Sequence, residues 1–289
     1  NMTHQRTGRQ GVALFEAIAA YAKNIENLAA LTSAVERIAQ KHTSFNIQPE
    51  HYQIVGLHLI ETLRELAADA FTPEVEEAWT AAYLFLAQVF IDREAELYLQ
   101  RKQAVGGWEA ARAFVIADKI EESALVTSFI LQPKDGGDVL DYTPGQYIGI
   151  EVKPEGAQYS EIRQYSLSDK PNGKQYRISV KREGQGQETQ GVVSNHMHDT
   201  VAIGDEVSLY APAGDFMYQE RSKPVTLISA GVGVTPMQSM LEFLNNEQKN
   251  EPVLYLHACE NVGQHSFTTR VKDIVADKGW AAKTWYMNK

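Results

Sequence analysis

Cysteine occurs once in the 289 residues, at Cys259. A single thiol cannot form an internal disulfide bond, and it cannot supply the ligands of a cysteine-bound zinc or iron–sulfur site. No apolar run approaches the roughly 20 residues that an α-helix needs to cross a bilayer, and the N-terminus shows no signal-peptide pattern. We therefore expect a cytoplasmic protein without a membrane span.

Long runs of lysine or arginine are also absent, and the net charge is -10. A chain of this charge is a poor partner for nucleic acid or for an anionic membrane surface. Apolar residues make up 44% of the sequence and charged residues 22%, as in ordinary globular proteins. The length suits two to three domains. We expect small-molecule partners and a monomer.

Residues 1–104 follow a helical pattern. Leu14, Ile18, Tyr21 and Ile25 recur on one face of a first helix. Ser33–Glu36 has the form of a capping box that opens a second helix. Pro49 and Pro73 stand where a third and a fourth helix would begin, and no strand pattern interrupts this part.

Gly106-Gly107 marks the end of the helical part, and short β-rich runs separated by turn residues follow it. This pattern predicts a small antiparallel barrel within residues 105–219. Strands are expected at the following runs: 124–130, 147–152, 176–180 and 207–210.

The last part, residues 220–289, alternates strand and helix patterns. A continuous apolar strand at Val225–Ser229, a glycine turn, a helix at Met237–Asn246 and a strand at Val253–His257 predict a βαβ unit in a parallel sheet. A further helix is expected near 267–278. Because such domains are usually larger, and because the chain begins in a helical pattern without an initiator methionine, we expect a piece cut within a domain at each end.

His42 is in phase with the apolar residues Val35, Ile38 and Ala39 of the second helix. A histidine on such a face is more often a satisfied core residue than a metal ligand. Tyr52 begins the stripe of the next helix, and Glu94 lies on the apolar phase of the last one. A buried carboxylate needs a partner, and a ligating histidine commonly donates its second N–H to one. Glu94 could equally be solvated at a frayed helix end.

Gln10 and Leu14 lie at i and i+4 on the first helix and could line a pocket. Taken alone, the two positions favour a surface glutamine beside a core leucine over a pocket.

The run Arg163-Gln164-Tyr165-Ser166 reads as a strand, on which alternate side chains share a face. Tyr165 could stack on an isoalloxazine ring, Arg163 could neutralise a phosphate and Ser166 could bond the edge of a flavin. Tyr147 offers a second aromatic face. The alternative is an ordinary barrel strand with a paired arginine.

Two glycine-containing blocks follow at Gly191-Val192-Val193-Ser194 and Gly231-Val232-Gly233-Val234-Thr235-Pro236. The first fits a helix start whose free N–H groups favour a pyrophosphate, although a simple helix cap explains it equally well. The second follows the run Val225–Ser229, which we expect to be a buried strand, and it opens a helix. This is the context of a nucleotide loop, but the block has no third glycine. A tight strand-to-helix turn is its alternative. The order of the blocks indicates electron transfer from a nicotinamide to a flavin.

With these residues placed, the chain resembles the flavohaemoglobins, the bacterial and fungal nitric oxide dioxygenases, along essentially its whole length. The similar blocks are Lys41–Phe45, Arg93–Glu96, Gly106–Glu109, Arg163–Leu167, Ala211–Phe216 and Ser229–Gly233. The resemblance implies an all-α globin-like domain at 1–104, an antiparallel β-barrel FAD domain at 105–219 and a partial α/β NAD(P)-binding domain at 220–289.

The resemblance also implies roles and cofactors. His42 corresponds to the proximal ligand of haem b, Tyr52 and Glu94 to the pair that hydrogen-bonds it, and Gln10 and Leu14 to distal-pocket residues. Tyr147 and Arg163–Ser166 correspond to FAD contacts, and Gly231–Pro236 to the NAD(P)H loop. The implied reaction carries electrons from NAD(P)H through FAD to haem and converts nitric oxide and O₂ to nitrate.

Two other readings stay open at the sequence level. One is an NAD(P)H–flavin reductase whose helical part holds no functional haem. The other is an oxygen- or nitric oxide-binding globin with a vestigial reductase. The resemblance places a distal tyrosine and a haem-packing phenylalanine before Asn1, and a flavin-covering aromatic residue after Lys289.

Overall fold

A computed structural model describes residues 9–184, 190–247 and 251–288. The contacts within the chain divide it into two compact units, Asn1–Gln100 and Arg101–Lys289. Within the described part, no helix is both long and apolar enough to cross a membrane.

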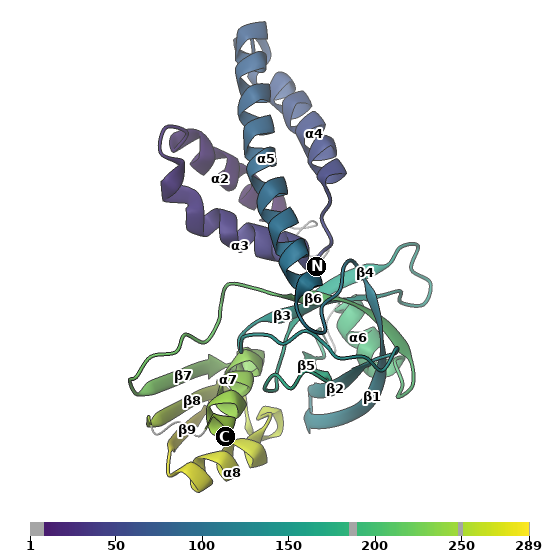
Figure 1. Cartoon of the computed structure of the whole chain (residues 1–289), viewed down its shortest axis with the longest axis vertical. Helices are drawn as coiled ribbons and strands as arrows, with labels where there is room; N and C mark the ends of the chain where they lie inside the picture. The colour runs from purple at the N-terminus through teal and green to yellow at the C-terminus, as the bar shows by residue number, and fades with distance from the viewer. Residues whose placement is uncertain (1–8, 185–189, 248–250, 289) are drawn as a thin grey trace. The chain divides into compact units, whose positions relative to one another are not determined.

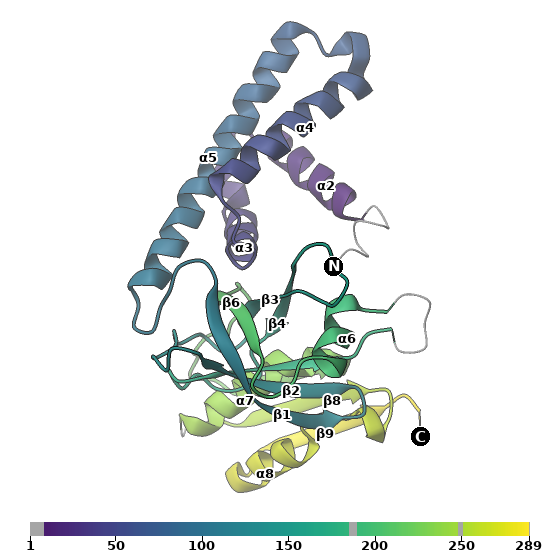
Figure 2. The same cartoon turned by 90° about the vertical axis from the view of Figure 1, so that its right-hand side faces the viewer.

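The first unit is helical (Figure 1). Its elements are α2 (Arg9–Lys23), η1 (Leu28–Leu31), α3 (Thr32–Thr43), α4 (Pro49–Ala67), η2 (Ala68–Ala70) and α5 (Pro73–Gln103), the last of which continues into the second unit. The helices α4 and α5 form an antiparallel hairpin (Figures 1 and 2). They cross at Gly56, where an added Cβ would lie 2.4 Å from Cε1 of Tyr83. Only glycine lets this ring lie so close to the α4 backbone.

The two proline starts are confirmed, because α4 begins at Pro49 and α5 at Pro73. The capping box at Ser33–Glu36 is wrong: α3 begins at Thr32, and Leu31 before it makes no side-chain cap. The chain enters α3 directly from η1 with helical dihedral angles at Leu31, so Ser33 already lies inside the helix. The first apolar stripe is also too long, since α2 ends at Lys23 and Ile25 is 48% exposed.

The second unit begins with a six-stranded antiparallel sheet in the order β4-β3-β6-β1-β2-β5. Its strands are β1 (Arg112–Ser123), β2 (Val126–Pro133), β3 (Tyr147–Val152), β4 (Glu161–Ser166), β5 (Tyr176–Lys181) and β6 (Glu206–Ala213). An antiparallel bridge between Leu167 and Ile178 connects the two edges, so the sheet closes into the expected barrel. Helix α6 (Val192–Asp199) packs beside β5 (Figure 1).

The longest barrel strand, β1, is not among those the sequence predicts. Its pairing with β2 shifts register between Ile116 and Asp118 and again between Glu121 and Ser123. Each shift interrupts the strict alternation of inward and outward side chains that marks a strand in a sequence. The strand expected at 124–130 instead runs over Val126–Pro133, because Ala124 and Leu125 form the turn of the β1–β2 hairpin.

The rest of the second unit is a parallel sheet, as the sequence predicts, and its strand order is β7-β8-β9. The elements are β7 (Val225–Ala230), η3 (Gly231–Gly233), α7 (Val234–Asn246), β8 (Val253–Cys259), η4 (Val262–Gln264), α8 (Thr268–Lys278) and β9 (Ala281–Tyr286). Side chains of α7 and α8 pack in one cluster with Leu227, Val253 and Tyr255. Both helices therefore cover the same face of the sheet.

The expectation that the apolar run Val225–Ser229 forms a buried strand is wrong in part. Leu227 is buried, but Ile228 is 67% exposed. Leu227 points toward the helices, whereas Ile228 points to the opposite face of the sheet, which no described helix covers. An apolar run is buried throughout only when both faces of its sheet are covered.

Candidate functional site

Three polar side chains predicted from separate helices converge in the first unit. Nδ1 of His42 on α3 lies 2.8 Å from Oε1 of Glu94 on α5 and 2.9 Å from the hydroxyl of Tyr52 on α4. The Tyr52 hydroxyl donates to the same Glu94 oxygen over 2.5 Å. Glu94 is only 3% exposed, which excludes the alternative of a solvated residue at a helix end.

This geometry determines which nitrogen of His42 carries the proton. A carboxylate oxygen only accepts hydrogen bonds, so Nδ1 must be the protonated nitrogen that donates to Glu94. Nε2 then keeps its lone pair, and it makes no hydrogen bond with a described residue. Burial and the hydrogen bond to Glu94 raise the pKa of Tyr52 above its ordinary value, which keeps the phenol protonated as a donor.

Phe90 completes the cluster, a role that the sequence does not reveal. Its ring centroid lies 5.8 Å from that of His42 and 6.2 Å from that of Tyr52. Phe90 stands one helical turn before Glu94, and this spacing is the signal that could have singled it out. The hydroxyl of Tyr83 donates to the Tyr52 carbonyl over 2.5 Å and fixes the start of α4.

The donor set suits a metal ion that a cofactor already coordinates and that needs one ligand from the protein. No group of three or more His, Cys, Asp or Glu that could hold a bare ion occurs in the described residues. A single histidine with a carboxylate behind Nδ1 instead fits the protein ligand of a haem iron, which His42 would hold through Nε2. His42 is 32% exposed, so its ring is accessible from one side.

The two distal residues are placed less fully. Leu14 lies on α2 and is 48% exposed, so it is not the core residue that its stripe suggests. Its neighbours Val12 and Phe15 are 57% and 71% exposed, which leaves α2 with uncovered apolar side chains in this unit. Gln10 also lies on α2, but its side chain is outside the described part.

The flavin candidates in the barrel fall on two faces of the sheet. Cross-strand partners share a face, and Arg163 and Tyr165 pair with the buried Ile150 and Ile148. Tyr165 packs against the barrel core, and burial raises its pKa to about 12. Arg163 pairs with Glu161 over 2.9 Å, the ion pair that the alternative reading expects. A bound phosphate would compete with Glu161 for this guanidinium.

Tyr147, Gln164 and Ser166 lie on the opposite face. Tyr147 pairs with Ser166, and Gly149 pairs with Gln164. Gly214 lies against the Tyr147 ring, a role that the sequence does not reveal. A Cβ at Gly214 would lie 2.8 Å from Cε1 of Tyr147, and its φ of +120° also favours glycine.

Helix α6 begins as the glycine block predicts, with Gly191 at the N-cap and Val192 as its first residue. The first N–H groups of a helix have no partner within it, so those at Val192, Val193 and Ser194 can meet an anion. The Nδ2 of Asn195 donates to the Glu183 and Gly191 carbonyls over 2.9 and 2.8 Å. The N–H of Glu183 donates to the Ser194 hydroxyl over 3.3 Å, so α6 begins close to the end of β5.

The second glycine block leaves the carboxyl end of β7 and turns through η3 into α7. Gly231 has a φ of +52°, and an added Cβ at Gly231 or Gly233 would meet nothing within 4 Å. The hydroxyl of Thr235 donates to the Val232 carbonyl over 3.0 Å and holds the turn. The exposed backbone at this end of a parallel sheet fits a nucleotide phosphate.

Two family models match this chain. The globin model covers residues 1–90, and the model described as oxidoreductase FAD-binding domain covers residues 113–218. A curated relative, the flavohemoprotein of Vibrio cholerae serotype O1, is 67% identical over the whole chain and 73% of its own length.

Solved structures give the same result. The flavohemoglobin of Malassezia yamatoensis, with bound FAD and heme, aligns over 99% of this chain and 73% of its own with a TM-score of 0.84 and 25% identity. The flavohem-like FAD/NAD binding domain of nitric oxide dioxygenase from Vibrio cholerae O1 aligns over 62% of this chain and 75% of its own, with a TM-score of 0.61 and 56% identity.

Proposed function

This chain belongs to the flavohaemoprotein family, and from that premise we propose that it is an NAD(P)H-dependent nitric oxide dioxygenase. It oxidises nitric oxide with O₂ to nitrate, with electrons passing from NAD(P)H through FAD to haem b. When bound, the haem supplies the centre at which the two gases react, and the flavin divides the electron pair of the nicotinamide into single electrons. The observation that carries the proposal is the convergence of His42, Tyr52 and Glu94.

In the globin part, His42 would hold the haem iron through Nε2. The carboxylate of Glu94 accepts the Nδ1 proton over 2.8 Å, which orients the ring and makes Nε2 a stronger electron donor. Tyr52 donates to that carboxylate and keeps it in place. An electron-rich proximal histidine favours activation of oxygen over simple carriage. Gln10 and Leu14 would line the opposite side of the pocket.

In the reductase part, Tyr147 and Tyr165 would contact the flavin ring, with Gln164 and Ser166 as polar contacts. Arg163 would meet a phosphate after exchanging its bond to Glu161, and Gly191–Ser194 at the start of α6 would bind the pyrophosphate. The turn Gly231–Pro236 would hold NAD(P)H. The cytoplasmic location and the monomeric state belong to the same proposal, as do the domain limits at 104 and 219.

The experiment is an absorbance spectrum of the purified protein, oxidised and then with NADH or NADPH, followed by nitric oxide consumption in air. We expect a Soret band, flavin bands, their bleaching by the nucleotide, and catalytic consumption of nitric oxide. His42→Ala should lose the Soret band and keep the flavin bands.

Each rival reading gives a different result. A flavin-only spectrum would favour the plain reductase, and a Soret band without nucleotide-driven turnover would favour the binding globin. An unshifted Soret band in His42→Ala would refute His42 as the ligand.

A further inference from the structure

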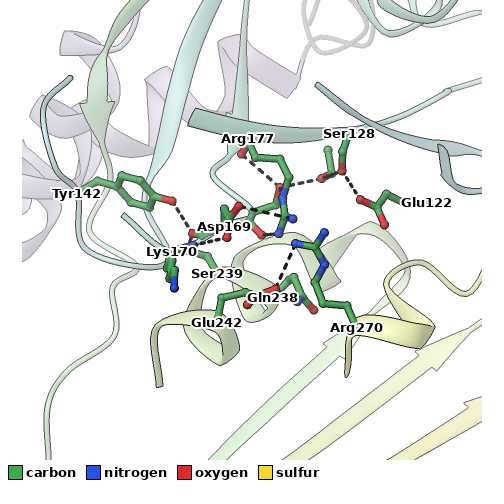
Figure 3. A network of polar contacts seen from close by, with 12 residues as sticks. Glu122, Ser128, Tyr142, Asp169, Lys170, Arg177, Gln238, Ser239, Glu242 and Arg270 are labelled. Atoms are coloured by element: carbon green, nitrogen blue, oxygen red, sulfur yellow. Dashed lines mark hydrogen bonds and ion pairs between the residues drawn. The ribbon is translucent and has the colours of Figure 1, made fainter. Parts of the chain in front are cut away.

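The barrel and the three-stranded sheet of the second unit meet at a buried polar seam. We define the seam by Tyr142, Asp169 and Arg177 on the barrel side and by Ser239 and Phe267 on the sheet side; Figure 3 shows its polar members. Four of the five are less than a tenth exposed: Tyr142 at 7%, Arg177 at 2%, Ser239 at 0% and Phe267 at 2%. Such burial is unusual for polar side chains, so Tyr142, Arg177 and Ser239 each need a hydrogen-bonding or ionic partner.

The carbonyl of Asp169 joins the two sides. The hydroxyl of Ser239 on α7 donates to it over 2.6 Å, and the hydroxyl of Tyr142 from the barrel donates to the same oxygen. A second bond between the sides runs from Nζ of Lys170 to Oδ1 of Asn246 over 2.6 Å. The turn after β4 is therefore held against α7.

Arg177 is anchored on the barrel and faces the sheet. Its guanidinium donates to the Ser168 carbonyl and hydroxyl and lies 3.6 Å from the Asp169 carboxylate. The same planar group lies over the ring of Phe267 at 5.5 Å. A cation–aromatic contact is stronger when the cation is buried away from solvent, as Arg177 is here. The arginine therefore links β5 to the start of α8.

Phe267 adopts a backbone conformation that needs outside support. It stands at the N-cap of α8 with a φ of +61°, in the left-handed region that bulky residues avoid. Strain of this kind persists only where surrounding contacts impose it. The ring packs in the apolar cluster of α7 and α8 and also lies against the guanidinium of Arg177, so these contacts hold Phe267 in the seam.

The segment that leads to Phe267 has a second attachment to the barrel. The turn of the β1–β2 hairpin donates from the N–H of Ala124 to the Gly263 carbonyl over 2.9 Å, and the hydroxyls of Ser123 and Ser266 are 2.9 Å apart. Residues 260–267 leave the carboxyl end of β8, the parallel neighbour of β7, which Gly231 follows. This segment thus shares its edge of the sheet with the proposed nucleotide loop.

We propose that Arg177 is a positioning residue for hydride transfer, which it serves by stacking on Phe267 and fixing the nucleotide edge of the sheet relative to the flavin barrel. The inference rests on the proposed function. In the step concerned, a hydride with its electron pair leaves the dihydronicotinamide, which is oxidised, and reaches the flavin, which is reduced. Small displacements between reacting groups slow such a step strongly.

The test compares Arg177→Met and Phe267→Leu with a matched control, Arg112→Met. Arg112 lies over Trp108 and Phe114 at 5.5 and 5.6 Å. It therefore makes the same kind of contact, but with rings of the barrel cluster and not with the parallel sheet. We expect both seam variants to slow flavin reduction by saturating NADH about tenfold or more. Flavin content and photoreduction of the flavin should stay unchanged. Phe267→Tyr, which keeps the ring, should restore the rate.

A second readout needs no nucleotide. Amide hydrogen exchange in residues 260–267 should be faster in Arg177→Met and Phe267→Leu, and unchanged in Arg112→Met. Wild-type exchange and wild-type flavin reduction in Phe267→Leu would overturn the inference, even if Arg177→Met fails to fold. If the unaltered protein is not reduced by NADH or NADPH, the proposed function fails instead, and the exchange measurement still decides whether the seam holds this segment.

Discussion

At the scale of single residues, the site in the first unit depends on one oxygen atom, Oε1 of Glu94. It accepts from the Tyr52 hydroxyl and from Nδ1 of His42, and it does so while almost wholly buried. A carboxylate and an amide have nearly the same shape but differ in charge. Their exchange therefore separates the electrostatic role of this residue from its packing.

We predict that Glu94→Gln keeps the Soret band but raises the haem reduction potential, because a neutral amide draws less electron density toward Nε2 of His42. Nitric oxide turnover should fall roughly 10- to 100-fold, the usual cost of losing such a supporting carboxylate. A spectroelectrochemical titration measures the potential. Glu96→Gln is the matched control, since Glu96 is 63% exposed and forms an ion pair with Arg93. An unchanged potential in Glu94→Gln would contradict the assignment.

At the scale of elements, α6 is held at the end opposite the N-terminus that we propose binds the pyrophosphate. Nζ of Lys119 on β1 donates to the carbonyls of Met197, His198 and Val201 over 3.4, 3.3 and 2.6 Å. The ammonium also lies 5.2 Å from the centre of the Phe129 ring. A cation at the C-terminus of a helix satisfies its last carbonyls and complements its dipole.

We predict that Lys119→Met destabilises the second unit by about 1–3 kcal/mol, the usual value of hydrogen bonds to a charged group. The methionine should still pack on Phe129. Because α6 loses its anchor, FAD should also dissociate more readily, which flavin fluorescence after dilution would report. Lys134→Met is the control, since Lys134 is half-exposed and pairs with Glu206. Equal stability and equal flavin retention in both variants would rule out the anchoring role.

The elements that the sequence predicts well are those with a local signal. The prolines that open α4 and α5 and the glycine that precedes α6 act within a few residues, and the structure has each where expected. Helical phase placed His42 and Glu94 on apolar faces, and the family resemblance grouped them with Tyr52, as the structure has them. The failures have tertiary causes. The bulges of β1 depend on its partner β2, and the exposure of Ile228 depends on which face of the sheet is covered.

At the scale of the whole molecule, the contacts that make the second unit cohere join residues far apart in the sequence. Ser239 and Asp169 are 70 positions apart, and Ser123 and Ser266 are 143 apart. No periodicity or motif identifies such pairs. The conformation of Phe267 likewise has no sequence signature, because left-handed backbone is ordinarily reserved for glycine or asparagine. The seam could be found only in the structure.

A stacked histidine pair, of which His257 is buried, should make the stability of this unit depend on pH. His257 on β8 is 1% exposed, and its Nδ1 lies 2.9 Å from the Ser229 hydroxyl. Its ring stacks on His265 at 5.3 Å, and Nδ1 of His265 lies 2.9 Å from the Tyr286 hydroxyl. Burial, and then the charge of a protonated His265, lower the pKa of His257 to about 4. The pKa of His265 is also lowered, by its burial and by Lys272.

The folded-state pKa of His257 lies below its unfolded value of about 6.5, so the unfolded chain binds the proton more tightly. Its contribution to stability is therefore complete above pH 6.5 and is lost as the pH falls toward 4, by about 3 kcal/mol in total.

We predict that His257→Asn, which cannot take up that proton, is less stable than the unaltered protein at pH 7 but closes the gap by pH 4.5. Urea unfolding across this range measures the difference. His58→Asn is the control, because the side chain of His58 is 71% exposed on α4 and its replacement should shift no pH dependence of this size. A gap that stays constant from pH 7 to 4.5 would show that His257 takes up its proton equally well in the folded protein.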